Sequence, residues 1–282
     1  MDDHLMQKEQ FIPFAEGLDH PEGVAWGPDG FLYAGGEAGQ IYRVSVDGEV
    51  TQIGSTGGFI LGMAHDAAAN VYACDLAHGA IMKITPAGHV SKYSDNAEPI
   101  PAPNYPVFDA SGNLYFSSSG SWHGNNGAIY RAQPGGATEV VSRDFTLFPN
   151  GMALSPDGTY LYIVLSNKPG VERARIQPDG TLGPPEPVVM LERTVPDGLA
   201  FDIEGNLYIS CYTPDRIYRL SPSGELRVLV EDWESTRISA PTNIAFGGAE
   251  MKTLFIASLC RWHLTKGELP VAGQRVHYPA LH

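Results

Sequence analysis

The sequence predicts an all-β fold, a six-bladed β-propeller with four-stranded antiparallel blades around a central channel. Three observations lead to this prediction. A short motif recurs six times along the 282 residues, each copy precedes a polar turn and a second apolar run, and no segment shows sustained helical periodicity. Successive copies start about 38 to 47 residues apart, which is within the range for four-stranded propeller blades.

The recurring motif predicts the first strand of each blade, and five of its six copies open with proline. The copies lie at residues 21–26, 60–65, 103–108, 149–154, 196–201 and 241–246. The turns that follow are rich in Pro, Asp, Asn and Gly, which preset or tolerate the backbone angles of tight turns. Further β-branched and aromatic runs predict the remaining strands, such as a third strand at 216–220 and a fourth at 226–230.

The six predicted sheets must stack on one another, because a single four-stranded sheet cannot bury both of its faces. A closed ring requires the first and last blades to meet. We therefore expect residues near Gln10–Ala15 to pair with the last blade, and one domain to cover residues 1–282. A stacked solenoid is the structural alternative, but six near-equal units without capping repeats favour the ring.

Charge and hydropathy narrow the choice of partners. Lys and Arg number 18 and Asp and Glu number 32, so the formal charge is 18 − 32 = −14. This balance argues against nucleic acids and anionic membranes and suits a small-molecule substrate and a cation. No run approaches the roughly 20 apolar residues of a membrane span, and the polar start Met1–His4 lacks signal-peptide features. We expect a cytoplasmic protein, monomeric or weakly homo-oligomeric.

The three cysteines are isolated in the sequence. Cys74, Cys211 and Cys260 form no CxxC pair and show no metal-type spacing. Such sparse usage fits a reducing compartment. We expect each of them to act as a small buried side chain.

Polar side chains recur at the second position of the motif, which the first strand of a blade places near the channel axis. In chain order this position holds Glu22, Leu61, Asn104, Asn150, Asp197 and Thr242. Two carboxylates and two amides converging at one mouth suit a hard cation, and we expect Ca²⁺. Zn²⁺, Mn²⁺ and Mg²⁺ are alternatives, although the absence of Cys and His from the ring disfavours Zn²⁺. Another interpretation is that these residues cap turns.

Three segments carry a family resemblance: Pro-Glu-Gly at 21–23, Pro-Asn-Gly-Met-Ala-Leu-Ser-Pro-Asp at 149–157, and Pro-Asp-Gly-Leu-Ala-Phe-Asp-Ile-Glu-Gly-Asn-Leu-Tyr at 196–208. With them the chain resembles the SMP-30/gluconolactonase/LRE-like family, the senescence-marker-protein-30-like lactonases. The resemblance implies that Glu22, Asn150 and Asp197 bind a divalent metal. It also implies that Asn104 contacts metal or substrate and that Asp197 is the general base of lactone hydrolysis. Diisopropyl-fluorophosphatase propellers use a comparable set of one Glu, two Asn and one Asp.

The chain departs from the family pattern at two places. The lactonases commonly read Arg-x-Asn-Asp in the third blade, where this chain has Ala102-Pro103-Asn104-Tyr105. The fourth blade commonly has Asp-Ser at the end of its second strand, where this chain has Leu165-Ser166. The metal residues are thus retained while polar substrate residues are missing, which indicates a substrate less polar than a sugar lactone.

The loops after the second strands should rim the same mouth, since the second strand runs antiparallel to the first. We expect substrate contacts from Tyr105, Trp122, His123 and Tyr212 in addition to Asn104. The longest of these loops, residues 117–127, is a candidate lid. His65 occupies the position of Trp26 and Phe108 in other copies, so it is expected to be a channel or core histidine.

These observations lead to the hypothesis of a metal-dependent lactonase or ester hydrolase. The bound cation would polarise the lactone carbonyl and Asp197 would activate water. The alternatives are a phosphotriesterase-like hydrolase and a non-catalytic ligand-binding propeller with a structural Ca²⁺ ion. A lyase or cyclase built on the same scaffold also stays open, since the fold does not decide the chemistry.

Overall fold

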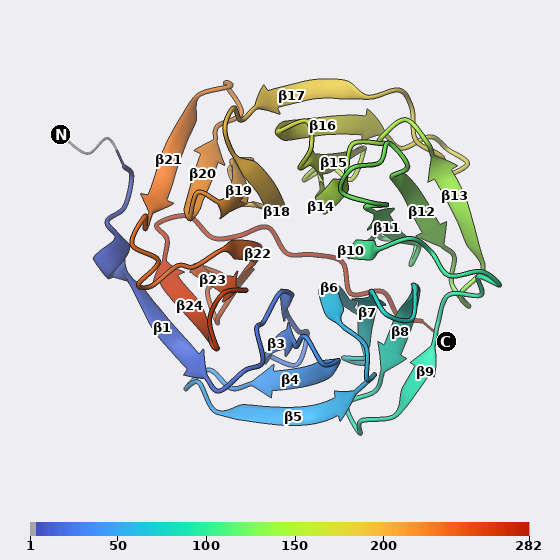
Figure 1. The fold of residues 1–282 in the computed structure, drawn as a ribbon, viewed down its shortest axis with the longest axis horizontal. Helices are drawn as coiled ribbons and strands as arrows, with labels where there is room; N and C mark the ends of the chain where they lie inside the picture. Colours follow the sequence, from blue (N-terminus) through green and yellow to red (C-terminus); the bar gives the residue numbers. More distant parts are fainter. Residues whose placement is uncertain (1–3, 282) are drawn as a thin grey trace.

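The computed structural model describes residues 4–281 and forms a ring of six four-stranded antiparallel sheets (Figure 1). Residues 1–3 and 282, which the single-domain and signal-peptide expectations include, lie outside the described residues. The predicted all-β, six-bladed propeller is confirmed. The one helical element among residues 4–281 is the short 3₁₀ turn η1 (Lys8–Gln10), so no helix in that range is long enough to cross a bilayer.

The first three blades follow the order of the chain, and each runs from the channel outward. Blade one contains β2 (Val24–Trp26), β3 (Leu32–Gly35), β4 (Gln40–Val44) and β5 (Val50–Ser55). Blade two contains β6 (Ile60–His65), β7 (Val71–Asp75), β8 (Ala80–Ile84) and β9 (Val90–Lys92). Blade three contains β10 (Pro103–Phe108), β11 (Leu114–Ser118), β12 (Ala128–Ala132) and β13 (Thr138–Ser142).

The next two blades repeat this order, and the sixth combines both ends of the chain. Blade four contains β14 (Pro149–Leu154), β15 (Tyr160–Leu165), β16 (Gly170–Arg175) and β17 (Glu186–Met190). Blade five contains β18 (Val195–Phe201), β19 (Leu207–Thr213), β20 (Arg216–Leu220) and β21 (Leu226–Glu231). Blade six contains β22 (Pro241–Gly247), β23 (Thr253–Ser258), β24 (His263–Glu268) and, as its outer strand, β1 (Phe11–Glu16).

A side-chain network explains why Asp, Asn and Tyr recur in the turns between the first and second strands. In blade five the Asp202 carboxylate accepts hydrogen bonds from the Asn206 side chain at 2.8 Å and the Tyr208 hydroxyl at 3.0 Å. Asp66 accepts the same pair of bonds from Asn70 and Tyr72 in blade two. The recurring Asp therefore shapes the turn and satisfies the buried hydroxyl of the second strand.

The ring closes through β1, as the sequence predicts. β1 pairs antiparallel with β24, with Phe11 opposite Gly267 and Glu16 opposite His263. The Phe11 ring is fully buried and covers Gly267 so closely that a β-carbon there would lie 2.5 Å from the ring. This strand supplies the fourth strand of blade six and joins the two ends of the fold.

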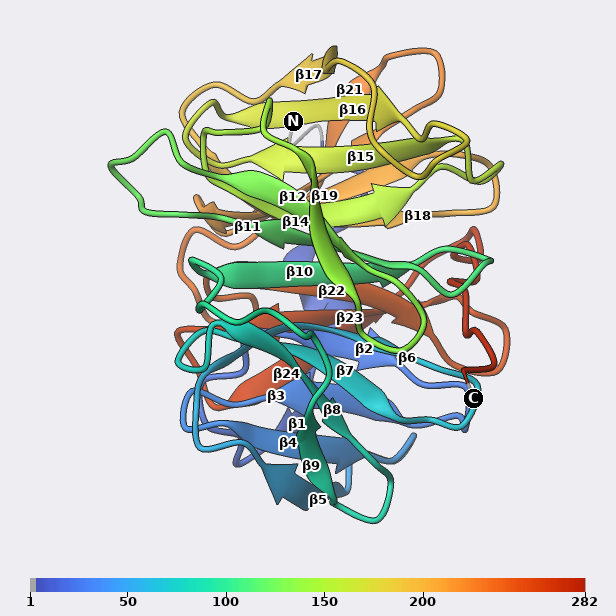
Figure 2. The ribbon, with the colours of Figure 1, turned by 90° about the vertical axis from the view of Figure 1, so that its right-hand side faces the viewer.

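A C-terminal strap, defined here as residues 272–281, crosses the channel at the end where the inner strands finish (Figures 1 and 2). At one end Gln274 N donates to Phe201 O at 2.8 Å. At the other end Ala67 N donates to Pro279 O at 2.9 Å. The strap therefore spans from blade five to blade two, and the opposite mouth of the channel is left uncovered by it.

The cysteine expectation is only partly correct. Cys74 and Cys211 are buried in second strands, but Cys260 is exposed. Its position explains the difference, because Cys260 lies in the turn that joins β23 to β24 at a mouth of the propeller. A turn at the rim has no layer of side chains above it.

Ring closure by β1 can be tested at neighbouring residues of the same strand. Replacing buried Phe11 with alanine is expected to lower the free energy of unfolding by about 3 to 5 kcal/mol, because it leaves a cavity in blade six. Urea unfolding followed by circular dichroism measures this change. The matched control is Ile12→Ala, since Ile12 is 47% exposed and should change stability by less than about 1 kcal/mol. Equal effects of the two substitutions would contradict closure through a packed β1.

Candidate metal site

Five of the six inner strands share an irregularity near their first residue. In β14, for example, the pairing with β15 shifts between Pro149 and Met152, and β18 shifts between Pro196 and Leu199. The same shift occurs in β6, β10 and β22. Such bulges leave residues unpaired and redirect side chains. The second position of the motif lies inside the shifted stretch, so the bulge sets the direction of Asn150 and Asp197.

The backbone enters several inner strands through a left-handed residue. His20, Ala102, Phe148 and Ala240 have φ angles of 42°, 47°, 58° and 46°, and each precedes the opening proline of its motif. Residues other than glycine seldom adopt this conformation. Its recurrence in four blades shows that the entry into the mouth has a repeated, constrained geometry.

Glycine follows the second motif position where neighbouring blades come closest. A β-carbon at Gly151 would lie 2.1 Å from the carbonyl oxygen of Asp197 in the next blade. A β-carbon at Gly23 would lie 1.9 Å from the carbonyl oxygen of Leu61. These contacts leave no room for a side chain, so glycine is required there. They also hold the backbones that carry the second-position residues of adjacent blades close together.

Four oxygen atoms at this mouth are buried without a hydrogen-bond partner. They are Glu22 Oε2, Asn104 Oδ1, Asn150 Oδ1 and Asp197 Oδ1, from residues that are only 4 to 5% exposed. Buried polar atoms are almost always paired in folded proteins, so four such oxygens at equivalent positions of the repeat need a common explanation. A cation with oxygen ligands supplies one.

Two serines hold the asparagine amides. Asn104 Nδ2 donates to Ser119 Oγ at 3.1 Å, and Asn150 Nδ2 donates to Ser166 Oγ at 3.3 Å. Each serine hydroxyl donates in turn to the carbonyl of the next blade's opening proline, at 2.8 Å and 2.7 Å. Because each amide nitrogen donates to a serine, while the two amide oxygens are without a partner, the oxygens are left for the channel.

The two carboxylates create an unfavourable charge arrangement unless a cation is near them. Burial raises the pKa of Glu22 well above its ordinary value, and the charge of Asp197 raises it further. Burial also raises the pKa of Asp197, while a hydrogen bond from Asn150 opposes that shift. Like charges in a buried site disfavour ionisation of both groups, and a divalent cation would reverse this.

The donor set fits a hard divalent cation. Glu22 and Asp197 contribute a formal charge of −2, and Asn104 and Asn150 contribute neutral oxygens, which is the ligand chemistry of Ca²⁺. Thr242, at the same position of blade six, donates its hydroxyl to the carbonyl of Glu22 at 2.7 Å. Its role there is to brace the backbone of a neighbouring blade.

The aromatic residues predicted to contact substrate lie around this mouth at different depths. Trp122 is 43% exposed, and its ring meets that of Phe148 edge-on at 4.9 Å between centroids. Tyr212 is 38% exposed, and burial, with smaller effects of Cys260 and Asp197, raises its pKa. Tyr105 is half-buried and also lines the apolar cavity deeper in the channel, and burial and the Asp197 charge raise its pKa.

The predicted lid is attached to blade four. The loop itself is shorter than the expected range 117–127, since Ser117 and Ser118 still belong to β11. The Asn167 side chain donates a hydrogen bond to the carbonyl of Trp122 in the remaining loop. His123 is exposed on this loop, so its contact with substrate stays a prediction.

No individual role was predicted from the sequence for Ser119, Ser166, Asp75 or Asp19, and the structure places the two aspartates in polar groups with His78 and with His20 and Glu37. Buried Asp75 has its Oδ1 atom 3.0 Å from His78 Nδ1, while its Oδ2 atom has no partner. Asp19, His20 and Glu37 place ligand-type atoms within 4.8 Å of one another, with His20 Nδ1 at 3.1 and 3.3 Å from the two carboxylates. Aligning residues after the second strands would have revealed only the serines, because they alone repeat in register.

Comparison with known proteins places the chain in a family. A family model described as SMP-30/Gluconolactonase/LRE-like region matches residues 89–260, more than half of the chain, including Asn104, Asn150 and Asp197. The chain belongs to the SMP-30/gluconolactonase/LRE-like family. A second model, strictosidine synthase-like, N-terminal, matches residues 5–44, which include Glu22. The resemblance inferred from the repeats is thereby confirmed.

Two curated relatives align with this chain over only part of their own length. A 6-deoxy-6-sulfogluconolactonase from Pseudomonas putida is 33% identical over 48% of this chain and 45% of its own length. A gluconolactonase from Zymomonas mobilis is 28% identical over 67% of this chain and 57% of its own length. The chain thus spans about half the length of these curated relatives.

A solved structure extends the likeness of fold to nearly the whole chain. The calcium-binding protein regucalcin from Agrobacterium tumefaciens superposes with a TM-score of 0.77, covering 96% of this chain and 98% of its own. The identity is 18%, so this comparison supports the propeller fold alone.

The paired carboxylates predict opposite effects of one substitution with and without metal. In EDTA, Asp197→Asn is expected to raise the free energy of unfolding by on the order of 2 kcal/mol, because it removes one of two buried like charges. With saturating Ca²⁺ the wild type should become the more stable protein, since it binds the ion more tightly. Thermal and urea unfolding measure both values. The control Asp47→Asn removes an exposed charge and should show no reversal. A variant less stable under both conditions would refute the charge argument.

Proposed function

We propose that this protein is a divalent-metal-dependent lactonase, with Ca²⁺ as the expected ion. The observation that supports the proposal best is the set of four buried, unpartnered oxygens on Glu22, Asn104, Asn150 and Asp197. Family membership and the activities after which the two matched relatives are named, a sulfogluconolactonase and a gluconolactonase, support the same reaction class.

The proposed roles follow from the chemistry of each side chain. A divalent cation held by these oxygens would supply Lewis acidity toward the carbonyl oxygen of the lactone. Asp197 would accept a proton from the water that attacks the ring carbonyl and then return it to the alkoxide of the opened ring. Glu22 would balance the cation's charge, and Ser119 and Ser166 would keep the Asn104 and Asn150 oxygens turned inward.

The substrate proposed for this mouth is a lactone with an apolar substituent. Ala102 and Tyr105 stand where the family pattern has an arginine and an acid, so polar partners for sugar hydroxyls are fewer. The Arg261 guanidinium at the rim is held by the neighbouring connection, because it donates a hydrogen bond to Ser235 O at 2.7 Å. The exposed rings of Trp122 and Tyr212 instead offer apolar surface to a substrate.

Turnover after metal removal and reloading tests the proposed reaction. EDTA treatment is expected to abolish hydrolysis of lactones, and Ca²⁺ should restore it, with Mg²⁺, Mn²⁺ and Zn²⁺ ranked in the same assay. In saturating metal, Asp197→Asn is expected to lower kcat by about 10²- to 10⁴-fold, the range for loss of a general base. Calorimetric titration of the ion confirms that the variant is loaded.

A second variant separates the role of a metal ligand from that of the general base. Asn150→Ala should weaken Ca²⁺ binding but retain most of kcat once saturated, because Asp197 is intact. Similar kcat losses in both saturated variants would contradict the role of Asp197 as base. Metal-restored hydrolysis of phosphotriesters but not lactones would favour the phosphotriesterase alternative. A rise in melting temperature with Ca²⁺ and no turnover would favour a structural ion.

The substrate preference is tested with a pair of lactones. The kcat/KM for a δ-lactone carrying an alkyl chain is expected to exceed that for glucono-δ-lactone by at least about tenfold, because apolar contacts in a pocket discriminate between substrates by about this factor. Trp122→Ala should raise KM for the alkyl lactone with little change in kcat. Ile203→Ala, an exposed apolar residue in the turn between β18 and β19, is the control. Preference for the sugar lactone would refute the apolar assignment.

A further inference from the structure

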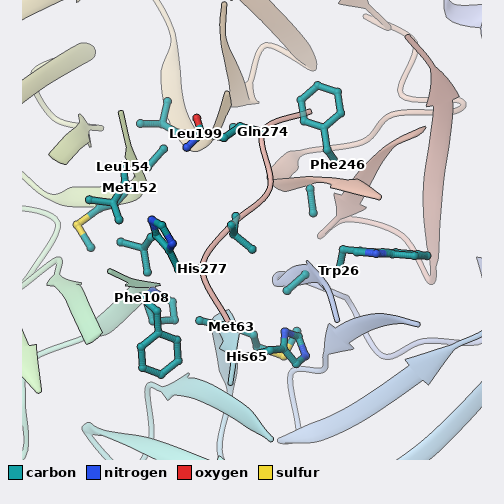
Figure 3. A pocket seen from close by; sticks show the side chains of 18 of the residues that line it. Trp26, Met63, His65, Phe108, Met152, Leu154, Leu199, Phe246, Gln274 and His277 are labelled. Carbon is teal, nitrogen blue, oxygen red and sulfur yellow. The ribbon is translucent and has the colours of Figure 1, made fainter. Parts of the chain in front are cut away.

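The channel has a second, apolar half that the proposed metal site does not use. A cavity of about 110 Å³ lies between the final residues of the six inner strands and the C-terminal strap (Figure 3). The four oxygen donors lie near the start of those strands, toward the opposite mouth. None of the four donors lines the cavity, although Tyr105, the residue after Asn104, does.

Small side chains at one position of the repeat line this cavity. The fifth residue of the motif is alanine in five blades and valine in one, namely Ala25, Ala64, Val107, Ala153, Ala200 and Ala245. Larger residues follow at the sixth position, namely Trp26, His65, Phe108, Leu154, Phe201 and Phe246. Apart from His65 the two rings are apolar, so the wall suits an uncharged, mainly apolar molecule.

Two polar atoms in this apolar wall are buried and unpartnered. They are His65 Nε2, on a side chain that is 2% exposed, and Gln274 Oε1, on the strap. Figure 3 shows them at different places around the cavity. Burial lowers the pKa of His65 to about 4, so its ring is neutral at pH 7. A hydroxyl group suits either atom, because it both donates and accepts a hydrogen bond.

The strap offers a route to the cavity. Its backbone hydrogen bonds lie toward its two ends, at 272–274 and at Pro279. The Tyr278 hydroxyl donates to Trp26 O at 2.6 Å between them. Arg275 and Val276 are exposed, and residues 275–277 make no backbone–backbone hydrogen bond within the described range 4–281. Local opening of such a segment needs few contacts to break.

We propose that this cavity is a binding site for a small, uncharged, mainly apolar molecule that carries one hydroxyl group, of the size of phenol. The dimensions support this class, since protein cavities of about 150 Å³ lined by apolar side chains bind benzene. The hydroxyl of the ligand would pair with His65 Nε2 or Gln274 Oε1. The site shares Tyr105 with the residues expected to contact substrate but contains none of the four oxygen donors, and it does not require lactonase activity.

The test compares neutral and charged probes on the full-length protein. Calorimetry and melting temperature are measured with phenol, benzene, cyclohexanol and benzoate. Phenol and cyclohexanol are expected to bind and to raise the melting temperature, benzene to bind at least threefold more weakly, and benzoate not to bind. The double variant Ala64→Val/Ala200→Val places valine, which blade three already has at this position, in blades two and five. The added atoms reduce the cavity, so phenol binding should weaken at least tenfold. The variant Gln274→Leu or His65→Phe should remove the preference for phenol over benzene.

Controls identify where the probe binds. Ala87→Val adds the same atoms on an exposed turn and should leave phenol binding unchanged. Trp122→Ala should also leave phenol binding unchanged, because Trp122 lies at the other mouth. Unchanged phenol affinity in the double variant, or loss of binding in Trp122→Ala, would overturn the proposal. Should the double variant fail to fold, xenon-pressurised crystals of the wild type provide an independent measurement. Xenon in the cavity supports the site, whereas its absence together with no heat of phenol binding overturns it.

Discussion

The close contact between neighbouring blades at the inner edge of the ring is the constraint on which the channel depends. Gly151 packs against the backbone of Asp197, and Gly23 against that of Leu61, with no space for a side chain between them. Each contact brings the second motif position of one blade close to that of the next. In a wider ring the same residues would lie too far apart to bind one Ca²⁺ ion, whose oxygen ligands lie at about 2.3 to 2.6 Å.

Burying four oxygen donors at this inner edge carries an energetic cost. Burial raises the pKa of both the Glu22 and the Asp197 carboxylates, and the charge of Asp197 raises that of Glu22 further. The serine relays act in the opposite direction, since Ser119 and Ser166 each bond an amide on one blade and a carbonyl on the next. Orientation of the site and cohesion of adjacent blades are therefore carried by the same hydroxyl groups.

The sequence predicted most of the fold because the repeat places equivalent residues in register. The third strand predicted at 216–220 matches β20 residue for residue, and ring closure lies where it was expected. Alignment of the repeats also brought out the four oxygen donors. Ser119 and Ser166 also align in the repeat, but their bonds to carbonyls of the next blade were not evident, because these bonds depend on how neighbouring blades pack. The strap was not evident either, since residues 272–281 carry no repeat and are held by scattered bonds to blades one, two, five and six.

Closure through β1 also affects how the chain folds as it is made. Phe11–Glu16 leaves the ribosome early, yet its partner His263–Glu268 follows only after five blades have been synthesised. Until then blade six lacks its outer strand, and the apolar face of β1 has no partner. The last pairing joins segments far apart in the sequence, so it carries a large loop-closure cost and a low rate compared with the hairpins within each blade. A nascent chain of this fold thus exposes an unpaired strand through most of its synthesis, and chaperone contact would be most useful at that end.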